Sequence, residues 1–203
     1  MKNNLLNLNS DCLTFREFKN MYLFFKVETN GLPNNWNAPI SDLKNWPRLI
    51  RLSWKLTDDN GNRIESNSAT IKPDNFSISK EASDVNGITT EIAMNEGVSI
   101  TSVLTKFNFL IDQADFIVSH NIRFGKKIIE CELLRNNFSS RFFDKTKIDV
   151  MKSSIVYCKL PSPYGFKYPK LTELYSYLFN QPSEETRSLE IIEGTSCGEK
   201  NPR

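Results

Sequence analysis

Apolar and polar positions along the chain follow two different periods, and the first part of the sequence shows the pattern of strands. The continuous apolar run Met21–Phe25 predicts a strand that is buried on both faces. Residues 49–56 alternate in part between apolar and polar, which is typical of a half-buried strand. The segment Asp58–Gly61 is a hairpin-turn signal, and residues 63–71 follow it as a further strand. These last two strands must therefore be adjacent and antiparallel.

The second part of the chain shows helical spacing instead. Apolar side chains recur at this spacing over 99–113, 122–136 and 169–179, and each segment predicts a helix. A short apolar run at 116–118 predicts a buried strand between the first two helices. Asn121 stands before the second helix and is expected to cap it. Strands that first pair as a hairpin and then alternate with helices predict an α/β protein with a mixed sheet.

Length and composition limit the class of protein. The 203 residues are 39% hydrophobic and 25% charged, which is the balance of a globular protein with a sizeable core. No apolar run approaches the roughly 18 residues of a membrane span, and the first residues hold too short an apolar stretch for a signal peptide. We expect a cytoplasmic protein without a membrane partner. It would consist of an N-terminal extension (1–20), one folded domain (21–193) and a flexible C-terminal tail (194–203).

Cysteine spacing argues against one kind of metal site, while the net charge leaves the type of partner open. The chain contains four cysteines and a single histidine, His120. No two cysteines have the CxxC spacing, which argues against a zinc site, and we expect reduced thiols, two of them buried. The formal net charge is +2. This balance neither requires nor excludes a nucleic-acid partner, because a basic groove is compatible with it.

Three separate stretches carry a resemblance to a known family. Residues 24–33 read FFKVETNGLP, residues 115–125 read DFIVSHNIRFG and residues 168–175 read YPKLTELY. In this order they resemble the motifs of the DEDD-type 3′–5′ exonucleases, a family that includes the proofreading (epsilon) subunit of bacterial DNA polymerase III and RNase T. The resemblance covers about residues 21–182. It implies a ribonuclease H-like fold, in which helices flank a five-stranded mixed sheet.

The resemblance also implies a metal-dependent reaction whose ligands are mostly missing here. In the family, four carboxylates hold two divalent cations, which activate water and stabilise charge on the scissile phosphate. At the matching positions Lys26 replaces the first carboxylate, Glu28 retains the second and Gly125 replaces the third. The final motif matches residues 186–193, where Ile191 takes the aspartate position and the histidine that serves as general base is absent.

We therefore expect an exonuclease-like domain that has lost catalysis, a pseudoenzyme with no metal cofactor. Its expected partner is the 3′ end of a nucleic acid or a polymerase-like protein. A charge argument favours this reading, because at about 4 Å and an effective dielectric near 20 a pair of unit charges is worth roughly 4 kcal/mol, and Lys26 repels a cation. The alternatives are an active 3′–5′ exonuclease with remodelled ligands, which would need Mg²⁺ or Mn²⁺, and a subunit that serves only protein interaction.

Charged residues at or near the former metal site have two interpretations each. Glu28 is the sole retained family carboxylate and is expected to be a relic of the catalytic site; the alternative is that it still takes part in catalysis. Lys26 either forms an ion pair that only satisfies Glu28, or also contacts a phosphate from the former metal position. Lys126–Lys127 is either solvated or in contact with a phosphate. Glu190 and Glu193 lie near the final motif, where either could replace a lost ligand.

The turn after the first strand is where family members hold the 3′-terminal nucleotide through backbone amides. Thr29, Asn30 and Gly31 stand at this position and are candidate substrate-binding residues. A simple turn explains Asn30 and Gly31 equally well.

Three residues of the second motif are further candidates for substrate binding, each with a structural alternative. His120 either contacts substrate or holds the strand end through its ring. Asn121 either contacts substrate or caps the helix, and Phe124 either supports a base or belongs to the core. Asp149 precedes another helical stretch and is expected to act as a cap or hydrogen-bond acceptor rather than a ligand.

Overall fold

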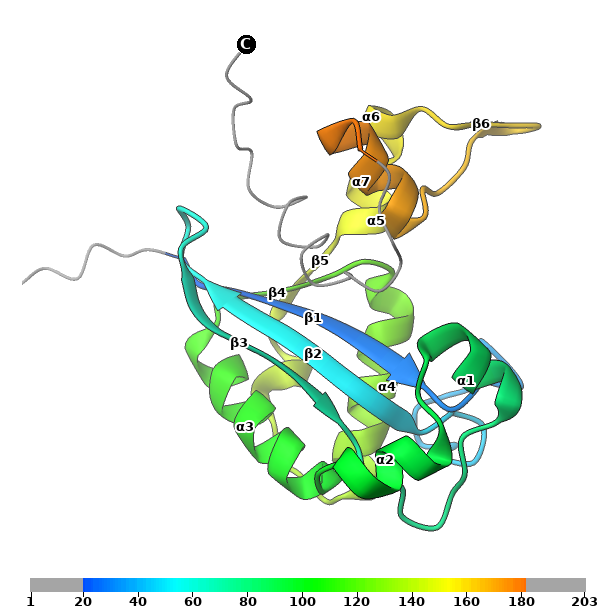
Figure 1. Cartoon of the computed structure of the whole chain (residues 1–203). Helices are drawn as coiled ribbons and strands as arrows, with labels where there is room; N and C mark the ends of the chain where they lie inside the picture. Colours follow the sequence, from blue (N-terminus) through cyan, green and yellow to red (C-terminus); the bar gives the residue numbers. More distant parts are fainter. Residues whose placement is uncertain (1–19, 182–203) are drawn as a thin grey trace, which may run out of the picture.

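The computed structural model describes residues 20–181. Nearly all of the expected N-terminal extension, the final-motif stretch 186–193 and the tail 194–203 lie outside the described residues, so the predictions for Glu190, Ile191 and Glu193 fall outside them as well. Within the described part, a five-stranded sheet is accompanied by helices, as Figure 1 shows, and a second sheet has two strands. No helix in this part is long and apolar enough to cross a membrane.

Five strands form a mixed sheet with β1 at its centre, in the order β3-β2-β1-β4-β5. β1 pairs antiparallel with β2 and parallel with β4, and β5 extends the parallel half. The predicted hairpin is confirmed, because β2 and β3 pair antiparallel across a turn in which Asp58 accepts hydrogen bonds from the backbone N–H groups of Asn60 and Asn62. The strands are β1 (Tyr22–Thr29), β2 (Leu49–Thr57), β3 (Arg63–Thr70), β4 (Phe116–Ser119) and β5 (Thr146–Asp149).

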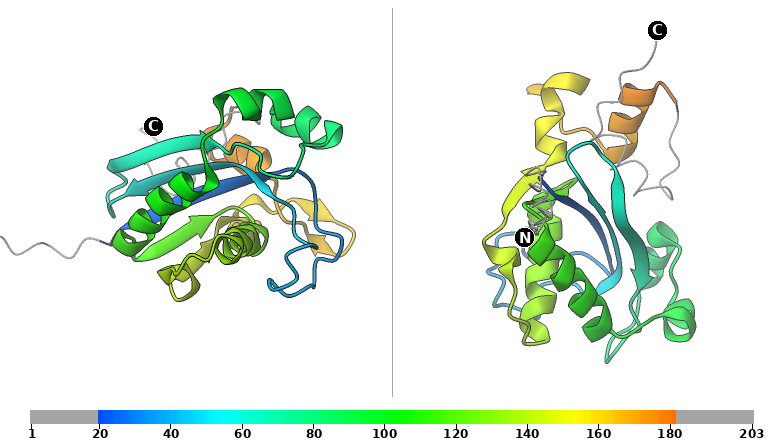
Figure 2. Two further views of the ribbon diagram at one scale, coloured as in Figure 1. Left: turned by 90° about the horizontal axis from the view of Figure 1, so that it is seen from below. Right: turned by 90° about the vertical axis from the view of Figure 1, so that its left-hand side faces the viewer.

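Two long helices, α3 (Ile100–Gln113) and α4 (Ile122–Arg135), pack on one face of the sheet (Figure 2). They confirm the helices predicted over 99–113 and 122–136. In the core between these layers, the ring of Phe25 lies 5.8 Å from that of Phe107 and 5.9 Å from that of Phe142, both edge-on. The predicted α/β class with a five-stranded mixed sheet is confirmed.

Several short elements complete the fold. α1 (Lys80–Asn86) and α2 (Thr90–Glu96) escaped sequence reasoning because helices of seven residues show little periodicity. Ser79 and Thr89 begin them as N-caps, each accepting a hydrogen bond of 3.1 Å from a backbone N–H in the first turn. The remaining elements are the 3₁₀ turn η1 (Arg141–Phe143), α5 (Val150–Ser153), α6 (Ile155–Cys158), β6 (Pro161–Ser162), β7 (Gly165–Phe166) and α7 (Leu171–Phe179).

The burial of β2 differs from the sequence prediction. We expected a half-buried strand, yet every residue of β2 except Arg51 is buried. One face of the strand joins the core under α3 and α4, while Ile50 packs with Ile78 and Ile88 in a second apolar cluster. The half-buried prediction is therefore wrong: the segment around α1 and α2 covers Ile50, and the polar residues Ser53, Lys55 and Thr57 are buried as well.

The expectation of two buried thiols is confirmed by Cys131 and Cys158, which are free and buried. Burial raises the pKa of the Cys131 thiol to about 11, which makes it unreactive near neutral pH. Cys12 and Cys197 lie outside the described residues.

Candidate functional site

The side chains of β1 divide between the core and an open face of the sheet. Leu23, Phe25 and Val27 join the core under α3 and α4. Because successive strand residues point to opposite faces, Lys26 and Glu28 lie on the other face, at the carboxyl end of the central strand. This is the position at which the family resemblance expects the catalytic carboxylates.

A groove of about 690 Å³ opens at this end of β1. It lies between α1 on one side and the start of α7 on the other, with the α4 turn and α5 at its edge. The groove brings together four of the predicted site residues, Lys26, Glu28, His120 and Asn121. The other lining residues are Arg51, Asp84, Val85, Asn86, Gly87, Met151, Tyr168, Pro169, Lys170, Leu171 and Thr172.

Glu28 is bound by two cations. Lys26 Nζ donates a hydrogen bond of 3.1 Å to Glu28 Oε1, so the ion pair considered in both sequence interpretations is present. Arg51 Nη1 lies 3.4 Å from Glu28 Oε2, a charge contact without hydrogen-bond alignment. Arg51 faces Glu28 because the two residues are register partners in the β1–β2 pair. Sequence reasoning missed Arg51, because its contact with Glu28 depends on the register of the β1–β2 pair.

The two cations change what this position can hold. The side chain of Glu28 is 12% exposed, while those of Lys26 and Arg51 are 30% and 31% exposed and open into the groove. A divalent ion bound to Glu28 would have to displace two positive charges at contact distance, which opposes binding. Among residues 20–181, no three His, Cys, Asp or Glu side chains are grouped closely enough to hold a metal ion. The arrangement instead suits an anion.

Gly125, at the position of the third family carboxylate, faces the core. A Cβ at this position would lie 3.1 Å from Cε2 of Phe25 and 3.5 Å from Oγ of Ser119. Phe25 is fully buried with Phe107 and Phe142 edge-on against it, so its ring would have to shift by a few tenths of an ångström to admit a side chain. The absence of a side chain at residue 125 is therefore built into the packing of the core.

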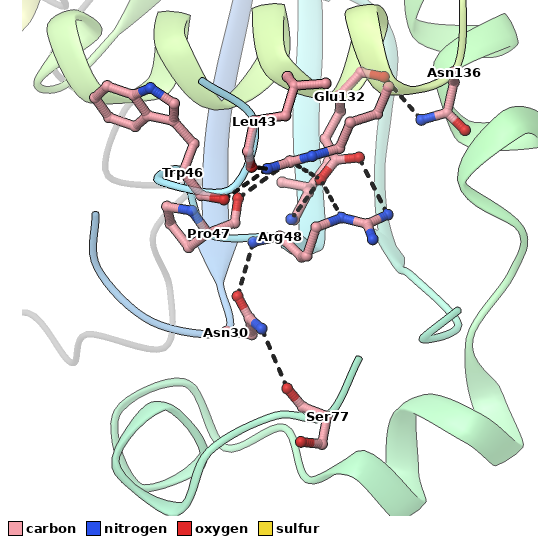
Figure 3. Close-up of polar contacts among 10 residues, drawn as sticks. Asn30, Leu43, Trp46, Pro47, Arg48, Ser77, Glu132 and Asn136 are labelled. Atoms are coloured by element: carbon pink, nitrogen blue, oxygen red, sulfur yellow. Dashed lines mark hydrogen bonds and ion pairs between the residues drawn. The ribbon is translucent and has the colours of Figure 1, made fainter. Parts of the chain in front are cut away.

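The turn after β1 is held by hydrogen bonds within the protein. Thr29 Oγ1 donates to the carbonyl of Gly31 at 2.7 Å, and the backbone N–H of Asn30 donates to the carbonyl of Arg48 at 3.0 Å. The Asn30 side chain accepts from the Arg48 N–H at 2.8 Å and donates to the Ser77 carbonyl at 3.2 Å, as Figure 3 shows. Both the backbone N–H and the side-chain amide of Asn30 thus already form hydrogen bonds within the protein, which weakens the prediction that Asn30 binds a nucleotide.

His120 lies half-buried at the groove wall. Burial lowers the pKa of its imidazole, while the nearby Asp149 carboxylate and the Pro169 carbonyl oppose that shift. Asp149 caps α5 as predicted, since its Oδ1 accepts from the N–H groups of Met151 and Lys152. Nδ1 of His120 and Oδ2 of Asp149 are both buried without a hydrogen-bond partner in the structure. The ring therefore lies near the residue that caps α5 and near the carbonyl of Pro169, which precedes α7.

The expectation that the Asn121 side chain caps α4 is wrong. Asn121 has the left-handed backbone conformation (φ 59°, ψ 56°) and makes no side-chain cap hydrogen bond. Its backbone carbonyl accepts instead from the N–H groups of Phe124 and Gly125. Asparagine tolerates this conformation better than most residues, which accounts for its presence at the turn. Its side chain is left to line the groove.

Phe124 packs against the core, and Lys127 of the following lysine pair contacts the 30–47 loop. Phe124 packs against the main core, as one interpretation predicts, and its ring lies 5.6 Å from that of Trp36. Lys127 Nζ donates to the carbonyls of Trp36 and Ala38 and lies over the Trp46 ring at 4.4 Å. The solvated interpretation is therefore wrong for Lys127. Lys126 forms an ion pair of 3.6 Å with Glu130.

A buried carboxylate on α4 fixes the chain that leads into β2. Glu132 is fully buried, and its Oε1 accepts from Arg48 Nε at 2.9 Å, from the Leu49 N–H at 3.2 Å and from Arg135 Nη1 at 2.8 Å (Figure 3). Arg135 also donates to the carbonyls of Leu43 and Trp46. Sequence reasoning did not single out this network, since Arg48 and Leu49 are more than 80 residues away from Glu132 in the chain.

Neither protein-family models nor curated proteins match this sequence. Solved structures of exonuclease I do match. A product-bound exonuclease I superposes with a TM-score of 0.68 and 18% identity, over 87% of this chain and 42% of that chain. Escherichia coli exonuclease I in complex with a dA16 oligonucleotide superposes with a TM-score of 0.68 and 19% identity, over 87% of this chain and 39% of that chain. A complex of exonuclease I with SSB-Ct superposes with a TM-score of 0.69 and 18% identity, over 88% of this chain and 40% of that chain.

These likenesses establish the fold. The chain has the ribonuclease H-like α/β fold of exonuclease I, as the resemblance implied. It spans less than half of the exonuclease I chain. The three structures compared above are of exonuclease I, and a closer relationship to the proofreading subunit or RNase T stays a prediction.

Proposed function

We propose that this chain is an exonuclease-like domain that binds the 3′ end of single-stranded nucleic acid and does not hydrolyse it. The observation that carries the proposal is the double ion pair of Glu28, with Lys26 at 3.1 Å and Arg51 at 3.4 Å. In this groove the cations stand where the family places metal ions. They can neutralise the charge of a phosphate, but they cannot activate water. Activation of water is the step for which the reaction needs a metal ion.

The charges of the groove support an anionic ligand. The groove is lined by three cations, Lys26, Arg51 and Lys170, and by two carboxylates, Glu28 and Asp84. The carboxylate of Asp84 already forms an ion pair of 3.2 Å with Lys80. Arginine presents several donors in a plane that fits a phosphate, and lysine adds a point charge. The fold adds support, since exonuclease I of the same fold has been solved with an oligonucleotide.

A cytoplasmic location and a role beside a polymerase, as the resemblance to the proofreading subunit suggests, belong to the same proposal. An active enzyme with ligands from residues 182–203 and a subunit devoted to protein interaction are the competing functions. The experiment below separates all three.

The test is a binding titration with a labelled single-stranded oligonucleotide of about 4 nucleotides at low salt, once in EDTA and once in Mn²⁺, followed by fluorescence anisotropy. Lys26→Met should weaken binding about 5–10-fold and reduce the slope of log affinity against log salt by about 1. Lys106→Met is the matched control, because Lys106 lies on α3 and pairs with Glu65, away from the groove. Absence of binding would favour the protein-interaction role, and binding that requires a divalent cation would favour the active enzyme.

A further inference from the structure

A second concavity lies on the other side of the turn that ends β1. It has a volume of about 590 Å³ and is bordered by Asn30 and Gly31, which follow directly from the strand carrying Lys26 and Glu28. Three cations line it, Lys44, Arg48 and Arg135, and no acidic residue does. The other lining residues are Leu32, Asn34, Leu43, Asn45, Trp46, Pro47, Asn75 and Phe76.

Arg48 is held in a fixed position within this concavity. Its Nε and Nη2 donate to Glu132 at 2.9 Å and 3.4 Å, and its guanidinium carbon lies 4.6 Å from the centre of the Phe76 ring. The backbone N–H of Arg48 donates to Asn30, which ties the arginine to the β1 turn (Figure 3). The side chain is still 26% exposed, so this preorganised cation faces the cavity.

The concavity carries a surplus of positive charge. Glu132 is a single carboxylate shared by Arg48 and Arg135, so one positive charge of the pair is not balanced. Lys44 is exposed and has no ion-pair partner among residues 20–181. The side-chain amide of Asn34 is exposed at the same rim and adds a hydrogen-bonding group. A concave, cationic surface of this kind favours polyanions.

We propose that this concavity, which we call the Lys44–Arg48 subsite, binds a phosphate of the same nucleic-acid strand, upstream of the 3′ end held at Lys26 and Arg51. The inference rests on the proposed function and adds the path of the strand. The two sites are separated by the turn at Thr29–Gly31, and four residues of extended chain between Lys26 and Asn30 span about 13 Å. A strand of a few nucleotides is therefore needed to occupy both.

The experiment compares short and long single strands. Wild-type protein should bind an oligothymidylate of about 8 nucleotides at least 10-fold more tightly than one of about 2 nucleotides. Lys44→Ala should leave the affinity for the short strand unchanged, weaken binding of the long strand about 3–10-fold and lower its salt slope by about 1. Lys106→Ala, also a removed lysine but outside both sites, should change neither.

The outcomes distinguish the two proposals. Equal affinity of wild type and Lys44→Ala for the long strand would overturn the Lys44–Arg48 subsite while leaving the groove at Lys26 intact. Binding of neither strand by the wild type would refute the proposed function and the subsite with it. Lys44 is used in preference to Arg48 because loss of Arg48 would leave buried Glu132 short of a partner and could unfold the protein.

Discussion

Cε2 of Phe25 lies 3.1 Å from the point that a Cβ on Gly125 would occupy. The phenyl ring sits in the core with Phe107 and Phe142 against it, so it has no easy way to yield. A carboxylate at residue 125, where the resemblance places the third ligand, is thus opposed by packing, and at residue 26, where it places the first, the charge of Lys26 stands instead. Two independent features of the molecule, one steric and one electrostatic, oppose restoration of a metal site.

Gly125→Asp should therefore destabilise the protein instead of adding a ligand. The side chain would clash with Phe25 and place a carboxylate at a buried position, and we expect a loss of about 3 kcal/mol in the free energy of unfolding. Denaturant titration measures it. Gly31→Asp is the control, since a Cβ there meets no atom within 4 Å, and it should cost less than about 1 kcal/mol. An unchanged midpoint for Gly125→Asp would contradict the steric account.

Glu28→Gln separates phosphate binding from metal catalysis by the direction of its effect. Removing the carboxylate frees Lys26 and Arg51 from their shared partner, so affinity for a short single strand should rise about 3–10-fold in EDTA. In a metal-dependent nuclease the same change would remove a ligand and weaken metal-dependent binding and cleavage. Anisotropy titration of wild type and variant decides, and a fall in affinity would count against the proposed function.

Glu132→Ala should be among the most destabilising changes on α4. It leaves the guanidinium groups of Arg48 and Arg135 without their carboxylate, at an expected cost of about 3–5 kcal/mol. Asp84→Ala removes one partner of an exposed ion pair and serves as the control, with an expected change below about 1 kcal/mol. Equal unfolding midpoints for the two variants would show that the buried network does not hold the 43–48 segment.

The titration of His120 provides a test at the groove wall. Burial lowers its pKa below the ordinary value of 6.5, so the unfolded state binds more protons and stability should fall as the pH drops below about 6.5. The chain has one histidine, so its imidazole NMR signal is unambiguous. Asp149→Asn removes the charge that opposes the shift and should lower the midpoint further. A midpoint above 6.5 in the wild type would contradict the buried placement.

The fold could be predicted from the sequence where the periodicity is strong. The apolar run that begins at Met21 and the helical spacing over 99–113 each identify an element, and the turn at Asp58 also identifies the pairing of β2 with β3. β5 was missed because Thr146–Asp149 is short and largely polar, and its place beside β4 depends on long-range pairing. The full burial of β2 was missed because a second apolar cluster covers Ile50 from residues far along the chain, and because Ser53, Lys55 and Thr57 are polar residues that the pattern assigned to solvent.

The site could be predicted only in part. The pairing of Lys26 with Glu28 follows from the strand period, which places residues two apart on one face. The contact of Arg51 with Glu28 depends on the register of two strands, and the joint hold of Glu132 on Arg48 and Arg135 depends on helix packing. Neither is encoded in a local pattern.

The central claim is that cations have replaced metal ions at the end of β1. The most direct measurement is the binding and integrity of a 5′-labelled single-stranded oligonucleotide with the whole chain, in EDTA and in Mn²⁺, by anisotropy and gel. The account predicts dissociation constants equal within about twofold and a full-length oligonucleotide after prolonged incubation in both. Tight binding only in Mn²⁺, with stepwise shortening of the strand from its 3′ end, would contradict it.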